Sequence, residues 1–400
     1  MNPLRDFLVI GGGVMGLALA RELRLRHPDQ SVTVLEKESF CGFHASGRNS
    51  GVLHAGLYYP PDSLKARFTR EGSRLMRQFC LEHRVPLNPC GKIVTAVSED
   101  QLPALEELYR RGTANGATLQ WLDDAQAKAL EPRVRTLGRA LFSPETAVVD
   151  PKALMIALAA EVQRLGGEIR LDTPYRGRTG DGVTAGAGER WRAGHVINAA
   201  GLHADRVARD FGFGLEFAIL PFIGLYLMGD EPPGWLRTHL YPTPDLDFPF
   251  LGVHGTVTAE GRVKVGPTAL PAFWREQYQG WSRFRWQEFL ETLGLGASLL
   301  WRGEAGLAAL AAREFPQRLR RVMLARAATL IEGIDPARWR RWGARGLRAQ
   351  LVHRPTGRLV MDFYTEGDHH SLHLLNTVSP GLTGSLAFAR HLLDDMAKRG

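Results

Sequence analysis

The chain has 400 residues, of which 44% are hydrophobic and 23% are charged. This composition excludes wholesale disorder and supplies apolar side chains for a large core, which predicts two structural domains. The formal net charge of +8 is compatible with nucleic acid, an anionic membrane surface or acidic small molecules as partners. No aromatic-rich basic motif typical of RNA binding is present, so we expect no specific nucleic-acid partner.

The cysteines and the N-terminal segment exclude further classes. Cys41, Cys80 and Cys90 are odd in number and include no CxxC pair, which argues against a disulfide framework, a dithiol redox centre and a zinc site. We predict no bound metal. No apolar run reaches the length of a membrane-spanning helix, and glycines break the apolar stretch after Arg5, unlike a secretory signal. We expect a cytoplasmic protein, and its basic charge leaves peripheral attachment to the inner membrane face open.

The first elements in chain order predict a nucleotide-binding unit. Residues 5–10 form an apolar run typical of a buried parallel strand, and residues 14–25 predict a helix directly after a glycine-rich turn. Residues 31–35 form a second apolar strand, which Glu36 closes. Strand, helix and strand in this order are typical of a βαβ unit.

The rest of the chain continues with alternating element types. Residues 41–61 are rich in Gly, Ser and Asn and predict a long loop, which is usually functional inside a compact domain. Residues 217–275 alternate in polarity, as in a mixed or antiparallel sheet. The other expected elements are helices at 63–83 and 151–166, strands at 168–171 and 195–198, a mostly helical segment at 274–310, a strand at 372–375, a turn at 377–384 and a helix at 385–398.

The glycine-rich turn carries the most specific motif. Gly11-x-Gly13-x-x-Gly16 follows a strand and opens a helix, and Glu36 lies 20 residues after Gly16. Glycines at these positions let the backbone approach a pyrophosphate at the positive end of a helix, and the acid can accept hydrogen bonds from a ribose hydroxyl. The acid argues against NADP. Because one such motif is visible, we expect no second nucleotide site.

Several segments together resemble a known family of flavoproteins. The turn at 11–16, Glu36, the loop Ser46–Tyr59 and Asn198-Ala199-Ala200-Gly201 resemble the D-amino-acid-oxidase/glycine-oxidase superfamily. Within it, the loop resembles the L-2-hydroxyglutarate dehydrogenase (oxidase) family. Matches cover nearly the whole chain and include Ser63-Leu64-Lys65-Ala66, Tyr241-Pro242, Val265-Gly266-Pro267, Gly346-Leu347-Arg348-Ala349-Gln350, and His373 with Leu375-Asn376 and Ser379-Pro380.

The resemblance and the elements together predict the fold class. We expect an α/β fold, α+β overall, with a Rossmann-like FAD-binding domain and an interleaved mixed-sheet substrate domain. The FAD-binding domain is predicted at residues 1–85, 150–215 and 335–400. The substrate domain is predicted at residues 86–149 and 216–334.

The resemblance implies that FAD is the cofactor. Its pyrophosphate would rest on residues 11–16 and its ribose on Glu36. The turn at 377–384 precedes the last helix, whose positive end would face the flavin edge that becomes negative on reduction. The expected cofactor-binding residues are Gly11, Gly13, Val14, Met15, Gly16, Glu36, Lys37, Ser46, Gly47, Arg48, Asn49, Ser50, Gly51, Val52, Leu53, His54, Ala199, Ala200, Gly201, Ser379, Pro380, Gly381, Leu382 and Thr383.

The resemblance also implies residues for chemistry. Arg348 follows the family's Gly-Leu-Arg pattern, where arginine grips the substrate carboxylate, which a planar guanidinium fork matches bidentately. A histidine suits the base that takes the hydroxyl proton; His54 is the first candidate, and His254 or His373 could take the role instead. Further expected substrate-binding residues are Tyr59, Tyr226, Tyr241, Lys65 and Arg275.

One segment departs from the hydroxyglutarate family. After Pro221-Phe222 that family usually has a basic residue followed by Gly-Glu-Tyr-Tyr, whereas this chain has Ile223 and Leu225 at the basic and acidic positions. If these positions touch the substrate, its distal carboxylate would lack a partner. The departure bears on the identity of the substrate and leaves the flavin chemistry unchanged.

The predicted function is FAD-dependent oxidation of a small 2-hydroxy acid to the 2-oxo acid by hydride transfer, with L-2-hydroxyglutarate to 2-oxoglutarate as the best candidate. One alternative is an oxidase or dehydrogenase of a 2-amino acid or N-methylglycine. Another, from a different class, is a non-catalytic flavin- or RNA-binding protein. The electron acceptor stays open between oxygen, a quinone and a carrier flavoprotein.

Overall fold

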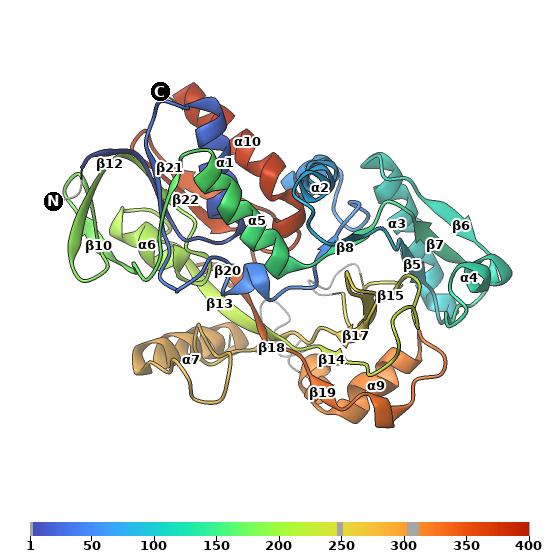
Figure 1. The fold of residues 1–400 in the computed structure, drawn as a ribbon. Coiled ribbons are helices and arrows are strands. Elements are labelled where there is room, and N and C mark those ends of the chain that lie inside the picture. The colour runs from blue at the N-terminus through green and yellow to red at the C-terminus, as the bar shows by residue number, and fades with distance from the viewer. Residues whose placement is uncertain (1–2, 246–250, 302–311, 400) are drawn as a thin grey trace.

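The computed structural model describes residues 3–245, 251–301 and 312–399, and two large sheets organise it (Figure 1). The first sheet has the strand order β10-β11-β12-β1-β2-β9, and β22 and β21 extend it beside β12. β1 (Arg5–Ile10) lies at its centre and pairs in parallel with β2 (Val32–Leu35) and β12 (Glu189–Asn198). The other strands are β9 (Glu168–Arg170), β10 (Tyr175–Thr179), β11 (Gly182–Ala185), β21 (Tyr364–Gly367) and β22 (Ser371–Asn376).

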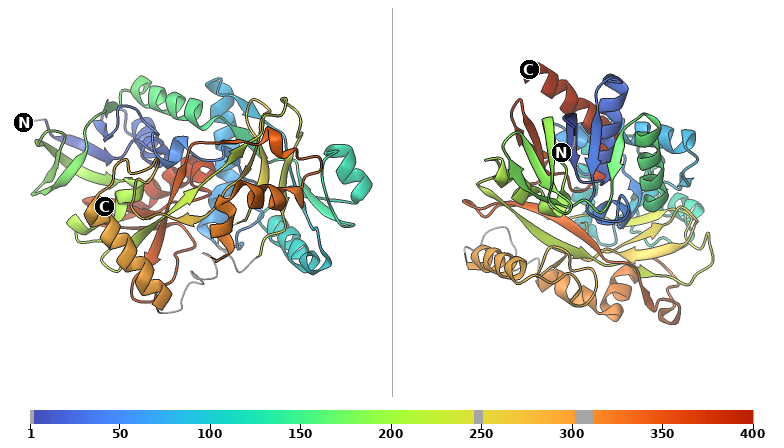
Figure 2. Two further views of the ribbon diagram at one scale, coloured as in Figure 1. Left: turned by 90° about the horizontal axis from the view of Figure 1, so that it is seen from below. Right: turned by 60° about the vertical axis from the view of Figure 1, so that its left-hand side comes forward.

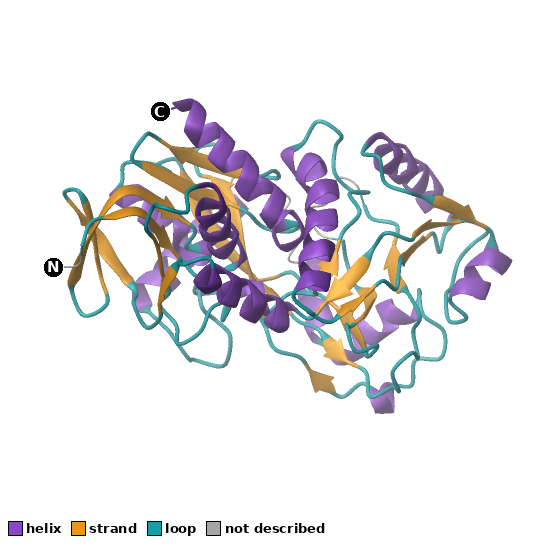
Figure 3. Cartoon of the chain, turned by 45° about the horizontal axis from the view of Figure 1, so that its top comes forward, coloured by secondary structure: helices purple, strands orange, loops and turns teal. Residues whose placement is uncertain are grey.

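Helices cover the first sheet, and Figure 3 shows them gathered over one of its faces. Apolar side chains of β1 and β2 pack against these helices in one continuous core cluster. On the opposite face, Leu8, Ile10 and Leu35 pack with β11 and with α6 (Ala204–Asp210). The covering helices are α1 (Val14–Arg26), α2 (Leu64–Glu82), α5 (Pro151–Arg164) and α10 (Gly381–Arg399).

The second sheet joins segments that are far apart in the sequence. Its order is β19-β14-β17-β16-β15-β5-β7-β6, and β5 (Lys92–Thr95) pairs in parallel with β15 (His239–Pro242). This pairing brings residues from two distant segments of the chain into one wall. The other elements of this region are β6 (Gln120–Leu122), β7 (Ala140–Ser143), β14 (Leu227–Met228), β16 (His254–Val257), β17 (Val263–Gly266), β19 (Arg341–Trp342), α3 (Leu102–Ala114), α4 (Asp124–Leu130) and α9 (Arg320–Ala328).

A short sheet connects the two regions. β13 (Phe217–Gly224) pairs antiparallel with β20 (Gly346–His353), so that Phe222 lies opposite Arg348. β18 (Leu270–Pro271) adds to the other edge of β13. A separate small sheet consists of β3 (Val52–Leu53), β8 (Ala147–Val149) and β4 (Leu87–Asn88).

The predicted α/β class is confirmed, and the boundaries differ in places. β12 begins at Glu189, earlier than the predicted strand at 195, because its first half forms a hairpin ladder with β11. The last helix begins at Gly381 rather than 385. In the segment expected to be mostly helical, α7 covers Trp286–Trp301, and residues 302–310 lie outside the described residues. The division into domains stays a prediction.

Within the described ranges, no helix combines the length and the apolarity that crossing a bilayer requires.

Candidate active site

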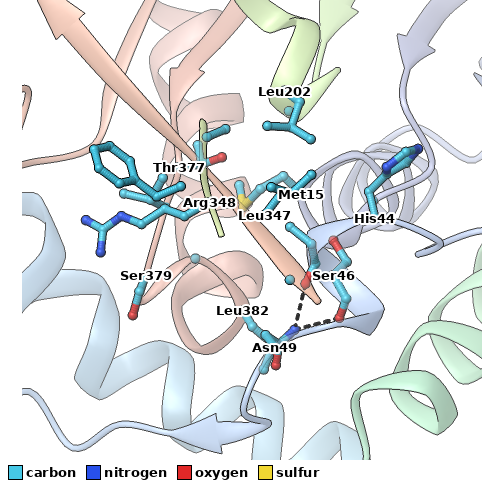
Figure 4. Close-up of a pocket in the computed structure, with 18 of the residues that line it drawn as sticks. Met15, His44, Ser46, Asn49, Leu202, Leu347, Arg348, Thr377, Ser379 and Leu382 are labelled. Carbon is cyan, nitrogen blue, oxygen red and sulfur yellow. Dashed lines mark hydrogen bonds between the residues drawn. The ribbon is translucent and has the colours of Figure 1, made fainter. Parts of the chain in front are cut away.

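One cavity of about 1470 Å³ runs between the first sheet, the connecting sheet and the second sheet. It exceeds the roughly 300–1,000 Å³ of typical small-ligand pockets, so it has room for a large cofactor and a substrate together. Its lining includes most of the residues that the sequence assigned to cofactor and substrate. Figure 4 shows part of this lining, with Met15, Ser46, Asn49, Arg348 and Ser379 around the same space.

The glycine turn between β1 and α1 is built for close backbone approach. Gly11 has φ +110°, and a Cβ there would lie 2.5 Å from the Ala199 carbonyl oxygen. A Cβ at Gly16 would lie 2.0 Å from the Gly11 carbonyl oxygen. Gly13 caps α1 and lines the cavity, so the positive end of that helix faces the cavity space. These features fit a pyrophosphate.

Glu36 holds the turn from the end of β2. One carboxylate oxygen accepts from the Gly12 N–H at 2.7 Å, and the other accepts from the Glu38 N–H at 2.9 Å. Burial raises the pKa of this carboxyl group. Glu36 lines the cavity, so its remaining acceptor capacity is available to a ribose hydroxyl.

The loop after β2 is fixed by its own hydrogen bonds. The Asn49 amide donates to the carbonyl oxygens of Ala45 at 3.1 Å and Ser46 at 2.6 Å (Figure 4). Asn49 Oδ1 accepts from the Gly51 N–H at 2.7 Å. Ser46 Oγ accepts from the Val14 N–H at 2.9 Å, which ties the loop to α1. The loop is therefore shaped to lie along a bound molecule.

The start of α10 continues the cavity lining beyond the loop after β2. Thr383 Oγ donates to the Val52 carbonyl oxygen and accepts from the His54 N–H, both at 3.2 Å. The lining residues in this stretch are Thr377, Val378, Ser379, Pro380, Gly381, Leu382 and Thr383. The positive end of a 19-residue helix thus faces the cavity, as the reduced flavin edge requires. Together, the glycine turn, Glu36 and this helix end fit FAD.

Three of the expected substrate residues form a cationic end of the cavity. Arg348, on β20, donates from Nε and Nη2 to Gln350 Oε1 at 3.1 and 2.9 Å. Lys65, on α2, is buried, and its burial together with the charge of Arg348 lowers its pKa to about 7. The Lys65 ammonium lies over the Tyr59 ring, 5.9 Å from the ring centroid. Burial raises the pKa of Tyr59 to about 12. This end suits a carboxylate-bearing ligand.

The three candidate histidines fall into two groups. His54 and His254 line the cavity, and burial lowers the pKa of each to about 3, so both are neutral at ordinary pH. His54 Nδ1 has no hydrogen-bond partner among the described residues. His254 Nδ1 donates to the Gly252 carbonyl oxygen at 2.9 Å, which leaves Nε2 as an acceptor. The His254 ring stacks on Tyr241 with centroids 3.8 Å apart.

His373 lies elsewhere. It is fully buried on β22, where its ring nitrogens contact Asn198 Nδ2 at 3.2 Å and Ser371 Oγ at 3.1 Å. Phe211 and Phe213 pack against the ring with centroids 5.0 Å away. As far as the described residues define the cavity, His373 is not part of its lining. The structure therefore gives it a packing environment instead of access to a ligand.

Arg275, another expected substrate residue, forms a buried ion pair. Its guanidinium donates to Asp205 Oδ1 at 2.6 Å and to Asp205 Oδ2 at 2.9 Å, and it also contacts the Leu202 carbonyl oxygen. The carboxylate that Arg275 binds is therefore that of Asp205, 70 residues away in the sequence, and not that of a substrate. Arg275 lies behind the lining, whereas its neighbour Glu276 lines the cavity.

The segment that differs from the hydroxyglutarate family, at the end of β13 and just after it, has residues in two environments. Phe222, Gly224 and Tyr226 line the cavity. Ile223 and Leu225 point the other way and pack in an apolar cluster. Successive side chains of β13 point to opposite faces, so Ile223 lies away from the face on which Phe222 lines the cavity.

Two lysines near the histidines, the fully buried Lys92 and the half-buried Lys264, were missed from the sequence. Lys92, on β5, is fully buried and finds no hydrogen-bond acceptor in the described part of the chain. Its ammonium lies 4.5 Å from the Tyr58 ring centroid and 5.2 Å from that of Tyr241, and burial lowers its pKa to about 7. Lys264, on β17, donates to the Ser50 carbonyl oxygen at 3.2 Å. Lysines in short strands are ordinarily exposed, so the sequence carries no signal for them.

An ion-pair network surrounds the expected adenosine end of the cavity. Glu38, His44 and Glu276 bring ligand atoms within 4.8 Å of one another, a grouping that could hold a metal. Both carboxylates, however, already have cationic partners: Glu276 pairs with Lys37 and both pair with Arg283. Arg283 holds the pKa of the Glu38 carboxyl group well below its usual range. Burial raises the pKa of Glu276, but the hydrogen bond to His203 and the charge of Lys37 outweigh it and hold that pKa well below its usual range. We therefore describe the group as a salt-bridge network.

Most of the expected cofactor residues line this cavity, and some support it from behind. Gly16, Gly47, Gly51 and Leu53 belong to the supporting group. A Cβ at Gly47 would lie 2.4 Å from the Gly42 carbonyl oxygen, which shows why the loop needs glycine there.

Comparisons with known proteins agree with this geometry. The family model described as "FAD dependent oxidoreductase" matches residues 6–394. The mitochondrial L-2-hydroxyglutarate dehydrogenase of Homo sapiens is 34% identical, over 98% of this chain and 89% of that protein. The L-2-hydroxyglutarate dehydrogenase of Escherichia coli (strain K12) is also 34% identical, over 97% of this chain and 92% of that protein.

Solved structures share the fold. The L-α-glycerophosphate oxidase of Mycoplasma pneumoniae, solved with FAD bound, matches with a TM-score of 0.76 and 21% identity, over 99% of this chain and 95% of that one. The glycine oxidase of Geobacillus kaustophilus matches with a TM-score of 0.73 and 21% identity, over 100% and 96% of the two chains. The chain belongs to the family of FAD-dependent oxidoreductases, and its cofactor is FAD.

Proposed function

We propose that the enzyme oxidises L-2-hydroxyglutarate to 2-oxoglutarate. The observation that carries the proposal is the meeting of Arg348, Lys65 and two neutral histidines in the cavity that fits FAD. A five-carbon substrate with two carboxylates matches two cations, and the L-2-hydroxyglutarate dehydrogenases at 34% identity act on such a molecule by their names. When bound, FAD supplies the hydride acceptor.

The chain's own residues would hold the substrate and move its proton. Arg348 binds the carboxylate next to the reacting carbon through its guanidinium fork. Lys65 attracts the distal carboxylate, and the buried ammonium of Lys92 adds positive potential behind the Tyr58 and Tyr241 rings. A neutral histidine, His54 first, accepts the hydroxyl proton as the C–H bond breaks.

The decisive experiment records the visible spectrum of the purified enzyme without oxygen. We expect L-2-hydroxyglutarate to bleach the flavin band and D-2-hydroxyglutarate to leave it unchanged. Bleaching by glycine or N-methylglycine, and not by L-2-hydroxyglutarate, would replace the proposal with oxidation of an amine. Bleaching by L-lactate at equal efficiency would show that the second carboxylate is not recognised.

The three histidines give a graded prediction. His54→Asn is expected to lower the rate of anaerobic flavin reduction by about 10²–10⁴-fold, the usual contribution of a positioned general base. His373→Asn should leave that rate within about twofold and affect chiefly thermal stability, because His373 packs between two phenylalanines. Stopped-flow absorbance measures the rate. If His254→Asn has the larger effect, the base is His254 and its Nε2 takes the proton.

Lys65 is expected to make kcat/KM for dicarboxylate substrates fall at alkaline pH. Its pKa is lowered to about 7, so it is charged below that pH and neutral above it. The kcat/KM for L-2-hydroxyglutarate should therefore fall as pH rises through about 7, since this parameter reports the free enzyme. Lys65→Met should remove this fall of kcat/KM with pH and should lower kcat/KM about tenfold or more at pH 6. With the monocarboxylate L-lactate, the same substitution should change little; an equal loss on both substrates would exclude a distal role.

A further inference from the structure

Lys92 is a cation buried behind the wall of the cavity. Its side chain has no exposed surface, and its Nζ finds no hydrogen-bond acceptor among the described residues. It lies on β5, which pairs with β15, and Figure 2 shows the blue-green and yellow strands of this sheet close together. The ammonium lies 4.5 Å from the ring centroid of Tyr58 and 5.2 Å from that of Tyr241. Both tyrosines line the cavity, so Lys92 is separated from it by one layer of side chains.

The groups that face Lys92 supply no compensating negative charge. Burial lowers the pKa of His54, His239 and His254, and the charge of Lys92 lowers it further, so all three are neutral. Burial also raises the pKa of the two tyrosines, which are therefore neutral phenols. β7, the other neighbour of β5, has no ionisable residue. Within the described ranges no carboxylate pairs with Lys92, so its charge acts on the cavity undiminished by a counter-ion.

This charge acts where the 2-substituent of a substrate would lie. His54 lines the cavity and is the first candidate for the group that takes the 2-hydroxyl proton, and the field of Lys92 reaches its ring. A neutral imidazole nitrogen accepts a hydrogen bond from a hydroxyl or from an ammonium, so this bond alone does not separate 2-hydroxy acids from 2-amino acids. A nearby buried cation does separate them, because it repels an ammonium and not a hydroxyl.

The other cations of the site cannot make this distinction. Arg348 and Lys65 would bind carboxylates, which both classes of acid carry. We propose that Lys92 is a specificity-determining residue that excludes 2-amino acids and thereby restricts the enzyme to 2-hydroxy acids. The inference rests on the proposed function, because it places the 2-hydroxyl beside His54. It also gives a reason for an ammonium at a fully buried position, since an unpaired buried charge costs stability and such costs are retained at functional sites.

Binding of glutarate and of L-glutamate to the oxidised, FAD-loaded enzyme tests the proposal. Both ligands have two carboxylates at the same spacing, so the contributions of Arg348 and Lys65 cancel in the ratio of their dissociation constants. Only L-glutamate has an ammonium. Each ligand is titrated at pH 6 by the change it causes in the visible flavin spectrum. We expect L-glutamate to bind about 30-fold or more weakly than glutarate. Lys92→Met should bring the two constants within about threefold of each other.

The same ratio should change with pH in the unaltered enzyme. Burial lowers the pKa of Lys92 to about 7, so its charge is present below that pH and is lost above it, whereas free L-glutamate keeps its ammonium throughout. We therefore expect the ratio to narrow between pH 6 and pH 8. Most of this narrowing should be absent in Lys92→Met. Burial lowers the pKa of Lys264, on β17, to about 8, and its titration accounts for the remainder.

Two controls separate specificity from folding. Lys152→Met, at an exposed lysine of α5, should leave both the ratio and the rate of flavin reduction unchanged. Thermal unfolding tests for a merely structural role. Lys92→Met is expected to raise the Tm at pH 6, because the ammonium that it removes is buried without an acceptor in the described part of the chain. The gain should shrink above pH 7, where Lys92 is already neutral in the folded protein.

The outcomes distinguish this inference from the proposed function. Flavin bleaching by L-glutamate and not by L-2-hydroxyglutarate in the unaltered enzyme would overturn both. Equal dissociation constants for glutarate and L-glutamate in the unaltered enzyme would overturn the inference alone, and so would a ratio that Lys92→Met leaves unchanged. If Lys92→Met does not fold, the pH series of the unaltered enzyme decides: a ratio that stays constant from pH 6 to pH 8 removes Lys92 from the selection of substrates.

Discussion

Gly13→Leu is expected to give a folded protein that purifies without flavin. Gly13 has φ −79° and ψ 177°, an extended backbone that leucine adopts without strain. Among the described residues, a Cβ there meets only Ser46 Oγ, at 3.1 Å, and the rest of the side chain would extend into the cavity that Gly13 lines. It would occupy the place of the pyrophosphate, so we expect FAD affinity to fall about a thousandfold or more, or about 4 kcal/mol.

The absorbance ratio of the flavin band to the protein band measures this loss. Gly177→Leu on β10 is the matched control, because it lies in an extended strand and an added Cβ there has no neighbour within 4 Å among the described residues. Circular dichroism should be the same for both variants. A yellow Gly13→Leu protein with full flavin occupancy would show that the pyrophosphate does not rest on this turn.

Arg348→Met is expected to produce a large loss of catalytic efficiency. The guanidinium is enclosed in the cavity, where burial lowers its pKa to about 10, and it would pair with the carboxylate that adjoins the reacting carbon. Removing one partner of such a desolvated pair costs about 2–5 kcal/mol, which corresponds to about 30- to 4,000-fold in kcat/KM. Steady-state kinetics with a dye acceptor measure it.

The substrate series distinguishes this role from that of Lys65. Arg348→Met should impair L-2-hydroxyglutarate and L-lactate alike, because both carry the carboxylate at the reacting carbon. Arg341→Met, at an exposed arginine on β19, serves as the control and should be neutral. Normal kcat/KM in Arg348→Met would remove this residue from the site. Arg348→Lys is expected to keep only part of the activity that Arg348→Met loses, since an ammonium lacks the planar fork.

The parts of the fold that sequence patterns predicted are those that local rules determine. The glycine turn and Glu36 lie within one βαβ unit, where spacing alone fixes which groups meet. The start of α10 was placed four residues late because Pro380, Gly381 and Gly384 resemble a turn. A proline near the first helical turn is compatible with a helix, since the first amides need no internal partner.

The parts that could not be predicted depend on contacts between distant segments. Arg275 pairs with Asp205. No local sequence pattern distinguishes such a paired arginine from one that binds a ligand. Lys92 lies near the histidines because β5 pairs with β15, which comes from a distant segment of the chain. Family resemblance identified His373 as well as His54, but only the tertiary structure shows which of them reaches the cavity.

The order in which the chain is synthesised has a consequence for loading of the cofactor. β22 pairs with β12 about 175 residues earlier, and the start of α10 supplies the wall at Thr383. These segments follow all other walls of the cavity in the chain, so a growing polypeptide cannot enclose FAD until they have left the ribosome. The nearly complete intermediate exposes apolar strand edges in the meantime, and such species are prone to aggregate. Abundant FAD during expression would therefore help only at the last step of folding, and C-terminal shortening before residue 383 should give flavin-free, poorly soluble protein.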